Sequence, residues 1–373
     1  MATYYGTTYW QLLWNNLRAR PIRTALSVLG VALQVAFVLL IVGMTLGWVN
    51  DWQKRAEGVG ADLMVQARNA SPFFQFNNAV LPESLAETLR SVPGVDEASP
   101  VLVMANPKNL EIVYGIDYTS FNALSQGFVF HAGGAFSRPG DLIVDDFQAA
   151  RHHLHVGDTY PLLNRDFTVC GIVAHGKGAR SYIPLATAEE IAGSAHHVTL
   201  FYVRSLGKGN TEVTRQQIVR RLPSEYTVRS MEEYLTLMNS SNLPGMGPFL
   251  DVMILLGVSI SFLVVLLTMH TMVLERTREI GVLKALGASR VEIARLFLAE
   301  SALMACVGVA AGLIATFLSR AFLHYWSPGL AVLLTPEWLL GSVGLAFLGA
   351  LLGALYPAWR ASGFDPVEAL AFE

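Results

Sequence analysis

The sequence predicts an α-helical membrane protein with four transmembrane helices and a large extracytoplasmic α+β domain inserted between the first and second helices. The chain has 373 residues, of which 53% are hydrophobic and only 15% are charged, whereas soluble domains usually carry about 25% charged residues. Four apolar stretches are each long enough to cross a bilayer, which takes about 20 helical residues. We assign the transmembrane helices to residues 24–48, 248–273, 296–323 and 338–359, with the domain at residues 49–247.

Residues 1–20 are predicted to form an amphipathic interfacial helix. Trp10, Leu13, Trp14 and Leu17 recur at the spacing of one helical face, and polar residues occupy the opposite face. A helix of this kind, with tryptophans on its apolar side, lies in the headgroup region of a membrane and contacts lipids. A short soluble helix packed on a partner protein is the alternative.

The basic residues predict the orientation of the chain in the membrane. Three arginines lie within residues 18–23 and five Lys or Arg residues lie within residues 274–295, whereas the short loop 324–337 has none. Short cytoplasmic loops carry the excess of basic residues. We therefore expect both termini, including the tail 360–373, and the 274–295 loop to be cytoplasmic, and the domain at 49–247 to be extracytoplasmic.

The large domain mixes short helical and strand patterns, which is typical of an α+β fold. The last two predicted strands are separated by Asn164 and Arg165 and suggest a hairpin. We predict helices at residues 81–92, 210–222 and 231–238, and strands at residues 101–105, 111–115, 142–144, 159–163 and 167–173.

Three predicted membrane helices contain small residues four positions apart. This spacing lets helix backbones approach one another closely, although single examples are common by chance. The patterns therefore predict only that these helices pack against other helices. They are Gly43 and Gly47, Gly308 and Gly312, and Gly349 and Gly353.

The segment from Leu274 to Glu300 predicts a tight corner between two helices just inside the membrane. Its first part continues the second membrane helix, and Gly287 is well placed to end a helix. Ser289 followed by Glu292 forms the pattern of a capping box, which starts the next helix. A rigid corner of this kind can pass a push from a cytoplasmic partner to two membrane helices at once.

Polar groups at membrane depth form a second set of candidates. Gln34 in the first membrane helix and Glu300 in the third are expected to face the interior of the helix bundle. Glu300 could pair with His270 or serve in packing, and both readings stay open. Glu275 and Arg278 are three residues apart and can pair on a helix surface.

Two segments of the sequence resemble the FtsX/MacB-type permeases of ABC transporters, which are the mechanotransmission-type membrane subunits. The resemblance rests on E-R-T-R-E-I-G-V-L-K-A-L-G-A-S, on the following apolar helix with Glu300, and on the terminal Y-P-A-W-R-A-S-G-F-D-P-V-E-A-L. It implies that the 274–295 loop docks on an ABC ATP-binding subunit, whereas a positive-inside anchor is the alternative reading of its charges. The implied coupling residues are Glu275, Arg276, Arg278, Glu279, Gly281, Lys284, Gly287 and Ala288.

The partners expected from the resemblance are a separate ATPase, a second permease copy as homo- or heterodimer, and a periplasmic adaptor protein as a candidate. The chain has no G-x-x-x-x-G-K-[ST] phosphate-binding loop, so we expect the partner ATPase, rather than this chain, to bind ATP and magnesium. We expect no catalytic residue, cofactor or metal ion in the chain itself. The paired histidines at 152–155 and 196–197 are read as solvated helix ends, and the net charge of −3 indicates no nucleic-acid partner.

The function implied by the resemblance is ATP-driven movement of the extracytoplasmic domain, used to export or extract a hydrophobic or amphipathic substrate. The alternative is an FtsX-like transmembrane regulator that activates an extracytoplasmic partner without transport. A membrane-anchored enzyme is the third hypothesis, but no Ser/His/Asp, Cys/His or paired-carboxylate constellation stands out in the sequence.

Overall fold

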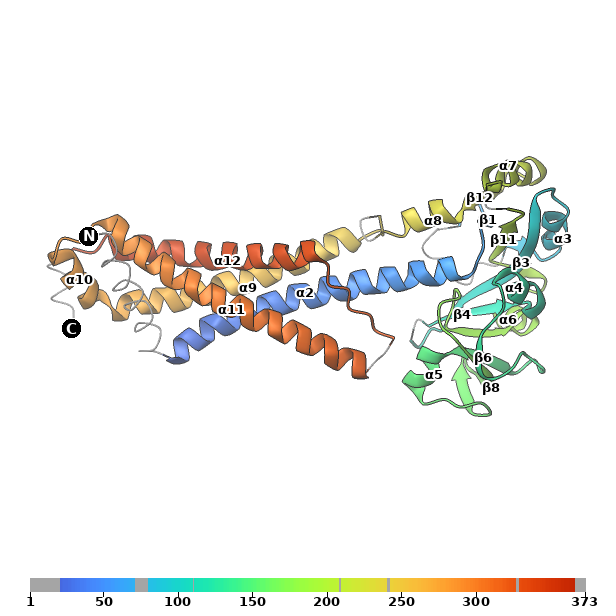
Figure 1. Ribbon diagram of the computed structural model, residues 1–373, viewed down its shortest axis with the longest axis horizontal. Coiled ribbons are helices and arrows are strands. Elements are labelled where there is room, and N and C mark those ends of the chain that lie inside the picture. The colour runs from blue at the N-terminus through green and yellow to red at the C-terminus, as the bar shows by residue number, and fades with distance from the viewer. Residues whose placement is uncertain are drawn as a thin grey trace. The chain divides into compact units, whose positions relative to one another are not determined.

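The computed structural model describes residues 21–70, 80–109, 111–207, 209–239, 242–326 and 329–365. The predicted amphipathic helix at residues 1–20 and residues 366–373 of the predicted tail lie outside the described residues. The chain divides into two compact units (Figure 1). The helical unit comprises Met1–Leu46, Gly247–Tyr325 and Val332–Glu373, and the α+β unit comprises Gly47–Met246 and Trp326–Ala331.

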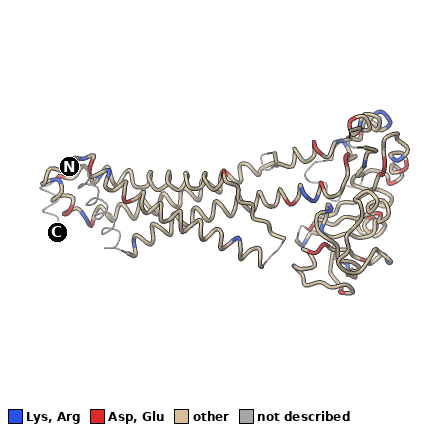
Figure 2. Tube along the Cα trace, viewed as in Figure 1, with Lys and Arg blue, Asp and Glu red and all other residues tan. Residues whose placement is uncertain are grey.

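Among the residues that the structure describes, the helical unit has four helices that are long and apolar enough to cross a membrane. They are α2 (Pro21–Gly58), α9 (Met246–Glu275), α11 (Arg290–Trp326) and α12 (Pro336–Ser362), and the short helix α10 (Thr277–Ala285) lies between α9 and α11. Figure 2 shows that charged residues are sparse along the long helices. Helix α2 continues past the predicted end at residue 48, so that its last turns belong to the α+β unit.

Small residues set the spacing between the long helices. Gly308 and Gly312 of α11 face α2, and a Cβ atom on Gly312 would lie 2.8 Å from the carbonyl oxygen of Ala32. Gly353 of α12 faces α9, where a Cβ atom would lie 2.7 Å from the carbonyl oxygen of Phe262. Larger side chains would force these backbones apart. The helix-packing prediction is therefore confirmed for both of these helices.

The first membrane helix also packs against another helix, since its Val31 and Ala32 face Gly308 and Gly312 of α11, but its own pair of glycines has a different neighbour. Gly43 lies against the extended segment that precedes α12, and its carbonyl oxygen accepts a hydrogen bond from the backbone nitrogen of Leu333 at 2.8 Å. Gly47 faces Ala331 of the same segment, where a Cβ atom would overlap the carbonyl oxygen. Both glycines make room for an extended chain rather than for a helix.

In the described part of the α+β unit, ten strands form a mixed sheet in the order β12-β1-β11-β3-β4-β9-β6-β8-β5, with β7 paired to β8. Most neighbouring strands are antiparallel, and the pairs β4–β9 and β6–β8 are parallel. A separate two-stranded sheet pairs β2 (Leu81–Pro82) with β10 (His197–Val198). The large sheet consists of β1 (Leu63–Ala67), β3 (Val95–Ala105), β4 (Ile112–Ile116), β5 (Phe130–Gly133), β6 (Asp141–Asp145), β7 (Thr159–Leu162), β8 (Arg165–Val173), β9 (Ser181–Pro184), β11 (Leu200–Ser205) and β12 (Tyr226–Ser230).

Side chains alternate between two hydrophobic cores along the strands of the large sheet. Leu63 and Val65 belong to one core, whereas Met64, between them, belongs to the other. Successive strand residues point to opposite faces, so both faces of this sheet are covered. The helices of this unit are α3 (Leu85–Arg90), α4 (Tyr118–Leu124), α5 (Asp146–His152), α6 (Leu185–Ala192), α7 (Thr211–Arg221) and α8 (Met231–Leu237).

Two sequence predictions in this unit need correction. The hairpin β7–β8 exists, but its two turn residues are Leu163 and Asn164, which have φ angles of 51° and 63° and match a type I′ turn. The helix predicted from residue 81 begins instead at Leu85. Residue 81 precedes a proline, which disfavours the helical conformation, and it pairs with Val198 as a strand.

Replacement of Gly58 by alanine tests how tightly the end of α2 is held. A Cβ atom there would overlap the carbonyl oxygen of Gly176, which is backbone and cannot turn aside. We expect Gly58→Ala to lower the unfolding free energy by about 1–3 kcal/mol, the usual cost of overpacking. The measurement is thermal unfolding of the full chain in detergent. Gly134→Ala, where no atom lies within 4 Å of the new Cβ, is the control, and an equal loss there would contradict the argument.

Candidate functional site

The corner between α10 and α11 is a defined pair of helix caps. Gly287 has a φ angle of 97° and ends α10, with its backbone nitrogen 3.0 Å from the carbonyl oxygen of Lys284. The backbone nitrogen of Ser289 donates to the Glu292 carboxylate at 2.7 Å, and the Glu292 nitrogen donates to the Ser289 hydroxyl at 3.3 Å. These reciprocal bonds are a capping box. They also hold the pKa of Glu292 below its usual value.

A buried ion pair ties the start of this corner to α11. Arg276 and Glu300 approach to 2.9 Å, and their side chains are only 7% and 1% exposed. The buried partner of Glu300 is therefore Arg276, an arrangement that the sequence reasoning did not anticipate. Arg276 also lies 3.7 Å from Glu279, whose side chain is exposed. Removing one member of a buried pair leaves an uncompensated charge, which is strongly destabilising.

Two further contacts tie the corner to α2 and α12. Glu275, the last residue of α9, forms an ion pair with Arg23 near the start of α2. The expected surface pair for Glu275 was Arg278, and the structure pairs Glu275 with Arg23 instead. The Lys284 ammonium donates to the carbonyl oxygen of Ser362 at 2.8 Å, at the end of α12. Helix α10 and its flanks are thus connected to all four long helices.

The outer face of α10 is exposed and partly apolar. Arg278 and Glu279 are exposed, as are Val282 and Leu286, which follow at helical spacing. Leu286 is 81% exposed, although a side chain of this size is usually covered. An exposed apolar ridge with charges at one end is typical of a protein-docking surface.

The structure divides the eight predicted coupling residues into two groups. Arg276 and Gly281 are buried, and Lys284 and Ala288 are half-buried, so these four support the corner from inside. The exposed members are Glu275, Arg278, Glu279 and Gly287.

The exposed apolar residues of α10 were missed by the sequence reasoning, which emphasised charge and capping. Val282, Leu283 and Leu286 are exposed, while Thr277 and Ile280 are buried. The helical phase of the buried positions would have identified them, because residues 278, 282 and 286 follow one another at intervals of four.

Gln34 lies inside the helical unit as predicted from its polarity at membrane depth. Its side chain is 3% exposed, and its amide nitrogen and oxygen have no hydrogen-bond partner among the described residues. It lies close to Gly257 of α9 and to Gly349 of α12. An unpartnered amide in an apolar interior is costly, so this position is a weak point of the packing.

One segment of the α+β unit comes close to a phosphate-binding loop in sequence but not in structure. Gly171 to Lys177 matches G-x-x-x-x-G-K, but Gly178 stands where the loop requires Ser or Thr. The Lys177 ammonium donates to the carbonyl oxygens of Ser125 and Gly127. The next element is the strand β9 rather than a helix. This segment therefore lacks the cradle that such a loop forms.

The α+β unit also contains a buried carboxyl group with a shifted pKa. Asp145 is 1% exposed and caps α5, accepting a hydrogen bond from the backbone nitrogen of Gln148 at 2.7 Å. Its second oxygen has no partner among the described residues. Burial raises the pKa of Asp145 from 3.8 to about 6.

Family models match most of the chain in two consecutive regions. Residues 24–222, more than half of the chain, match the MacB-like periplasmic core domain, and residues 252–366 match the FtsX-like permease C-terminal region. The unmatched residues between them, 223–251, contain β12, α8 and the first residues of α9.

Individual relatives align along nearly the whole chain. A macrolide export ATP-binding/permease protein MacB of Chlorobium phaeobacteroides is 26% identical over 96% of this chain, and that of Escherichia coli strain K12 is 25% identical over 97%. The chain spans about 60% of the length of both relatives. The crystal structure of the periplasmic region of MacB from Actinobacillus actinomycetemcomitans is 16% identical, with a TM-score of 0.38 over 47% of this chain and 92% of that one.

Substitution of Glu300 by glutamine tests the buried ion pair. Arg276 would stay buried with only the exposed and more distant Glu279 as a counter-charge, so we expect the unfolding free energy to fall by about 3 kcal/mol or more. The double variant Arg276→Met with Glu300→Gln should recover most of this loss, since no buried charge remains. Glu279→Gln, which removes the exposed partner of the same arginine, should cost less than about 1 kcal/mol. Equal losses in both single variants, measured by thermal unfolding, would contradict the pairing.

Asp145→Asn tests the buried carboxyl group through its pH dependence. The raised pKa means that the folded state binds the proton more tightly than the unfolded state. The resulting stability is fully present below about pH 4 and is lost as the pH rises through about 6. Asparagine keeps the cap without a charge, so the variant should be more stable than the original by on the order of 2–3 kcal/mol at pH 8. This gain should vanish near pH 4.

The measurement for this prediction is the unfolding temperature of the full chain at several pH values. Asp166→Asn, at an exposed position on β8, is the matched control and should show no such pH-dependent gain. A gain for Asp145→Asn that stays constant from pH 4 to pH 8 would refute the assignment of the shift.

Proposed function

Because the chain belongs to the FtsX/MacB-type permease family of ABC transporters, we propose that it is a membrane subunit whose α10 corner receives the motion of an ABC ATP-binding subunit. The proposal rests on one observation: the inner and outer faces of α10 have different surroundings. Its inner residues are bonded to the long helices around it, while its outer face presents Arg278, Val282 and Leu286. A force applied to that face reaches the membrane helices through bonded contacts.

The route from the helical unit to the α+β unit is helix α2. This helix is continuous from Pro21 to Gly58, and its last turns form part of the α+β unit. There, the Asp51 carboxylate lies 3.0 Å from Arg55 and 3.1 Å from Arg180, and Arg55 donates to the carbonyl oxygen of Gly178 at 2.9 Å. A displacement of α2 would therefore be passed to the loop that leads into β9. This is mechanotransmission through a single helix.

ATP and magnesium are assigned to the partner ATPase in this proposal. The MacB relatives are named as ATP-binding/permease proteins, and the chain spans about 60% of their length. The α10 corner and both chain ends would lie on the cytoplasmic side of the bacterial inner membrane, with the α+β unit on the other side. A second permease copy would complete the complex, since ATPases of this class work as pairs, and a periplasmic adaptor protein is a further candidate partner.

The transported substrate is proposed to be hydrophobic or amphipathic and to be exported or extracted on the outer side. The curated relatives are named for macrolide export. The match of residues 24–222 to a MacB-like periplasmic core domain supports the transport role over that of a regulator without transport.

The docking face can be tested by substitution at its most exposed apolar residue. Leu286→Asp places a charge in the proposed contact, and loss of a central hot-spot residue weakens binding by about 2 kcal/mol or more, which is over tenfold in Kd. We expect the ATPase to copurify at least tenfold less and substrate-stimulated ATP hydrolysis to fall in parallel. Arg278→Ala should have a smaller effect in the same direction.

Two matched controls separate docking from folding. Val213→Asp introduces the same charge at an exposed apolar position of α7, and Arg320→Ala removes an exposed arginine from the other end of α11. Both should copurify with the ATPase at the original level. If Leu286→Asp copurified with the ATPase and stimulated ATP hydrolysis at the original level, this face of α10 would not be the docking site.

A further inference from the structure

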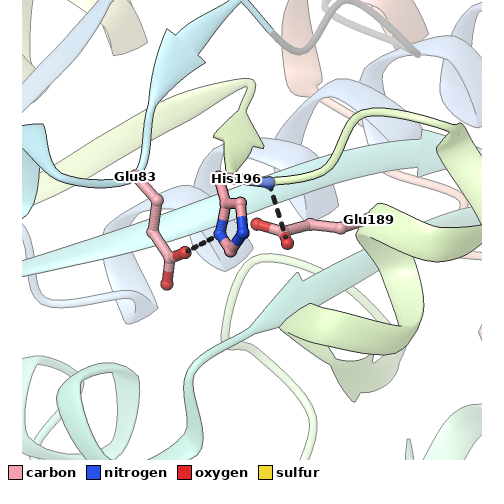
Figure 3. Close-up of side chains that lie close together, drawn as sticks. All are labelled: Glu83, Glu189 and His196. Atoms are coloured by element: carbon pink, nitrogen blue, oxygen red, sulfur yellow. Dashed lines mark hydrogen bonds and ion pairs between the residues drawn. The ribbon is translucent and has the colours of Figure 1, made fainter.

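Three side chains with metal-ligating atoms meet beside the small sheet of the α+β unit (Figure 3). Glu83 directly follows β2, Glu189 lies in α6, and His196 directly precedes β10. One ligand atom of each lies within 4.8 Å of those of the other two. The backbone nitrogen of Glu83 donates to the carbonyl oxygen of His196 at 2.9 Å, so the pairing of β2 with β10 fixes these two residues relative to each other.

Glu189 contributes a buried carboxylate, one oxygen of which has no hydrogen-bond partner among the described residues. The residue is 7% exposed, and one oxygen accepts a hydrogen bond from the backbone nitrogen of His196 at 3.1 Å. The other oxygen is buried and has no partner among the described residues. Buried polar atoms in native proteins are nearly always bonded to a protein group, a water or an ion. In Figure 3 this carboxylate points toward the imidazole of His196, so the unpartnered oxygen marks a place for a ligand.

The distance between the other two groups fits a shared ion better than a direct bond. The His196 Nδ1 atom lies 3.7 Å from a Glu83 carboxylate oxygen, which is too long for a hydrogen bond. Two ligands held about 2 Å from one tetrahedral zinc ion lie roughly 3.3 Å apart. Glu83 and His196 are 40% and 86% exposed in their side chains, so either can close this gap by a small rotation.

The donor set indicates which ion would be preferred. One imidazole nitrogen and two carboxylate oxygens suit zinc and neighbouring first-row divalent ions, whereas magnesium and calcium prefer more oxygen ligands. We propose that Glu83, Glu189 and His196 bind a divalent ion of the zinc class, with water completing its coordination. The ion would fasten the β2–β10 sheet to α6, and it would do so independently of the coupling face on α10.

Zinc binding to the full chain, without an affinity tag and in detergent, tests this proposal. We expect saturable binding of one zinc ion by isothermal titration calorimetry, together with a rise in unfolding temperature that calcium and magnesium do not reproduce. Cobalt(II) offers a second probe, because its visible absorption spectrum reports the coordination geometry. The ATPase partner is absent from this experiment, so the result is separate from the proposed function.

Two single variants and a matched control decide the outcome. His196→Asn suits the left-handed backbone at this position (φ of 58°), and the residue is so exposed that folding should not depend on it. Glu189→Gln keeps an acceptor for the backbone nitrogen of His196. Both should weaken zinc binding at least tenfold. His155→Asn, at an exposed histidine that lies 3.5 Å from the single carboxylate of Asp158, should leave it unchanged.

Three results would overturn the proposal. The first is that the original chain shows no saturable zinc binding. The second is that both variants keep a zinc affinity within twofold of the original. The third is that His155→Asn loses as much zinc affinity as they do, which would indicate that zinc binds to scattered surface histidines. Thermal unfolding of each variant without zinc shows whether the fold is intact. A zinc-dependent rise in unfolding temperature that is kept by His155→Asn and lost by His196→Asn would support the site.

Discussion

The buried ion pair between Arg276 and Glu300 is the interaction on which the coupling corner depends. Removing two charges from water costs several kcal/mol for each ion, and only close contact between them offsets this cost. The pair is therefore stable in the arrangement that keeps the observed 2.9 Å contact and strongly unfavourable in arrangements that separate the charges. In the proposed function, α9 and α11 would therefore respond together to a force on α10.

The other contacts between the corner and the long helices are weaker than the buried Arg276–Glu300 ion pair. Lys284 donates to neutral carbonyl oxygens at the end of α12, and the Arg23–Glu275 pair to α2 is about one-third exposed. Exposed ion pairs contribute about 0–1 kcal/mol, because water screens them and solvates the charges when they part. The corner is thus fixed firmly to α11 and loosely to α2. Under the proposed function, displacing α2 would therefore cost less at this corner than displacing α11.

The sequence predicted the features that depend on local pattern and failed where distant residues decide. Apolar length identified the four long helices, and the spacing of Ser289 and Glu292 identified the capping box that the structure contains. Arg276 was assigned to the contact with the ATPase, whereas in the structure it pairs with Glu300, which lies 24 positions away in another helix. No local sequence pattern predicts that ion pair. Gly43 was likewise assigned to helix packing, since sequence spacing does not say that its neighbour is an extended segment.

In the proposed function α2 is displaced, and one feature of the interior of the helical unit would ease that displacement. Gln34 lies on α2 between α9 and α12 and leaves both polar atoms of its amide unpaired among the described residues. A buried amide without partners raises the free energy of the arrangement that contains it by roughly 1–3 kcal/mol. A different position of α2 that gave this amide a partner would recover part of that energy. The described arrangement of α2 is therefore held by its apolar packing, in which Val31, Val35 and Leu39 are buried, and the unpaired Gln34 amide lowers the energy needed to shift the helix.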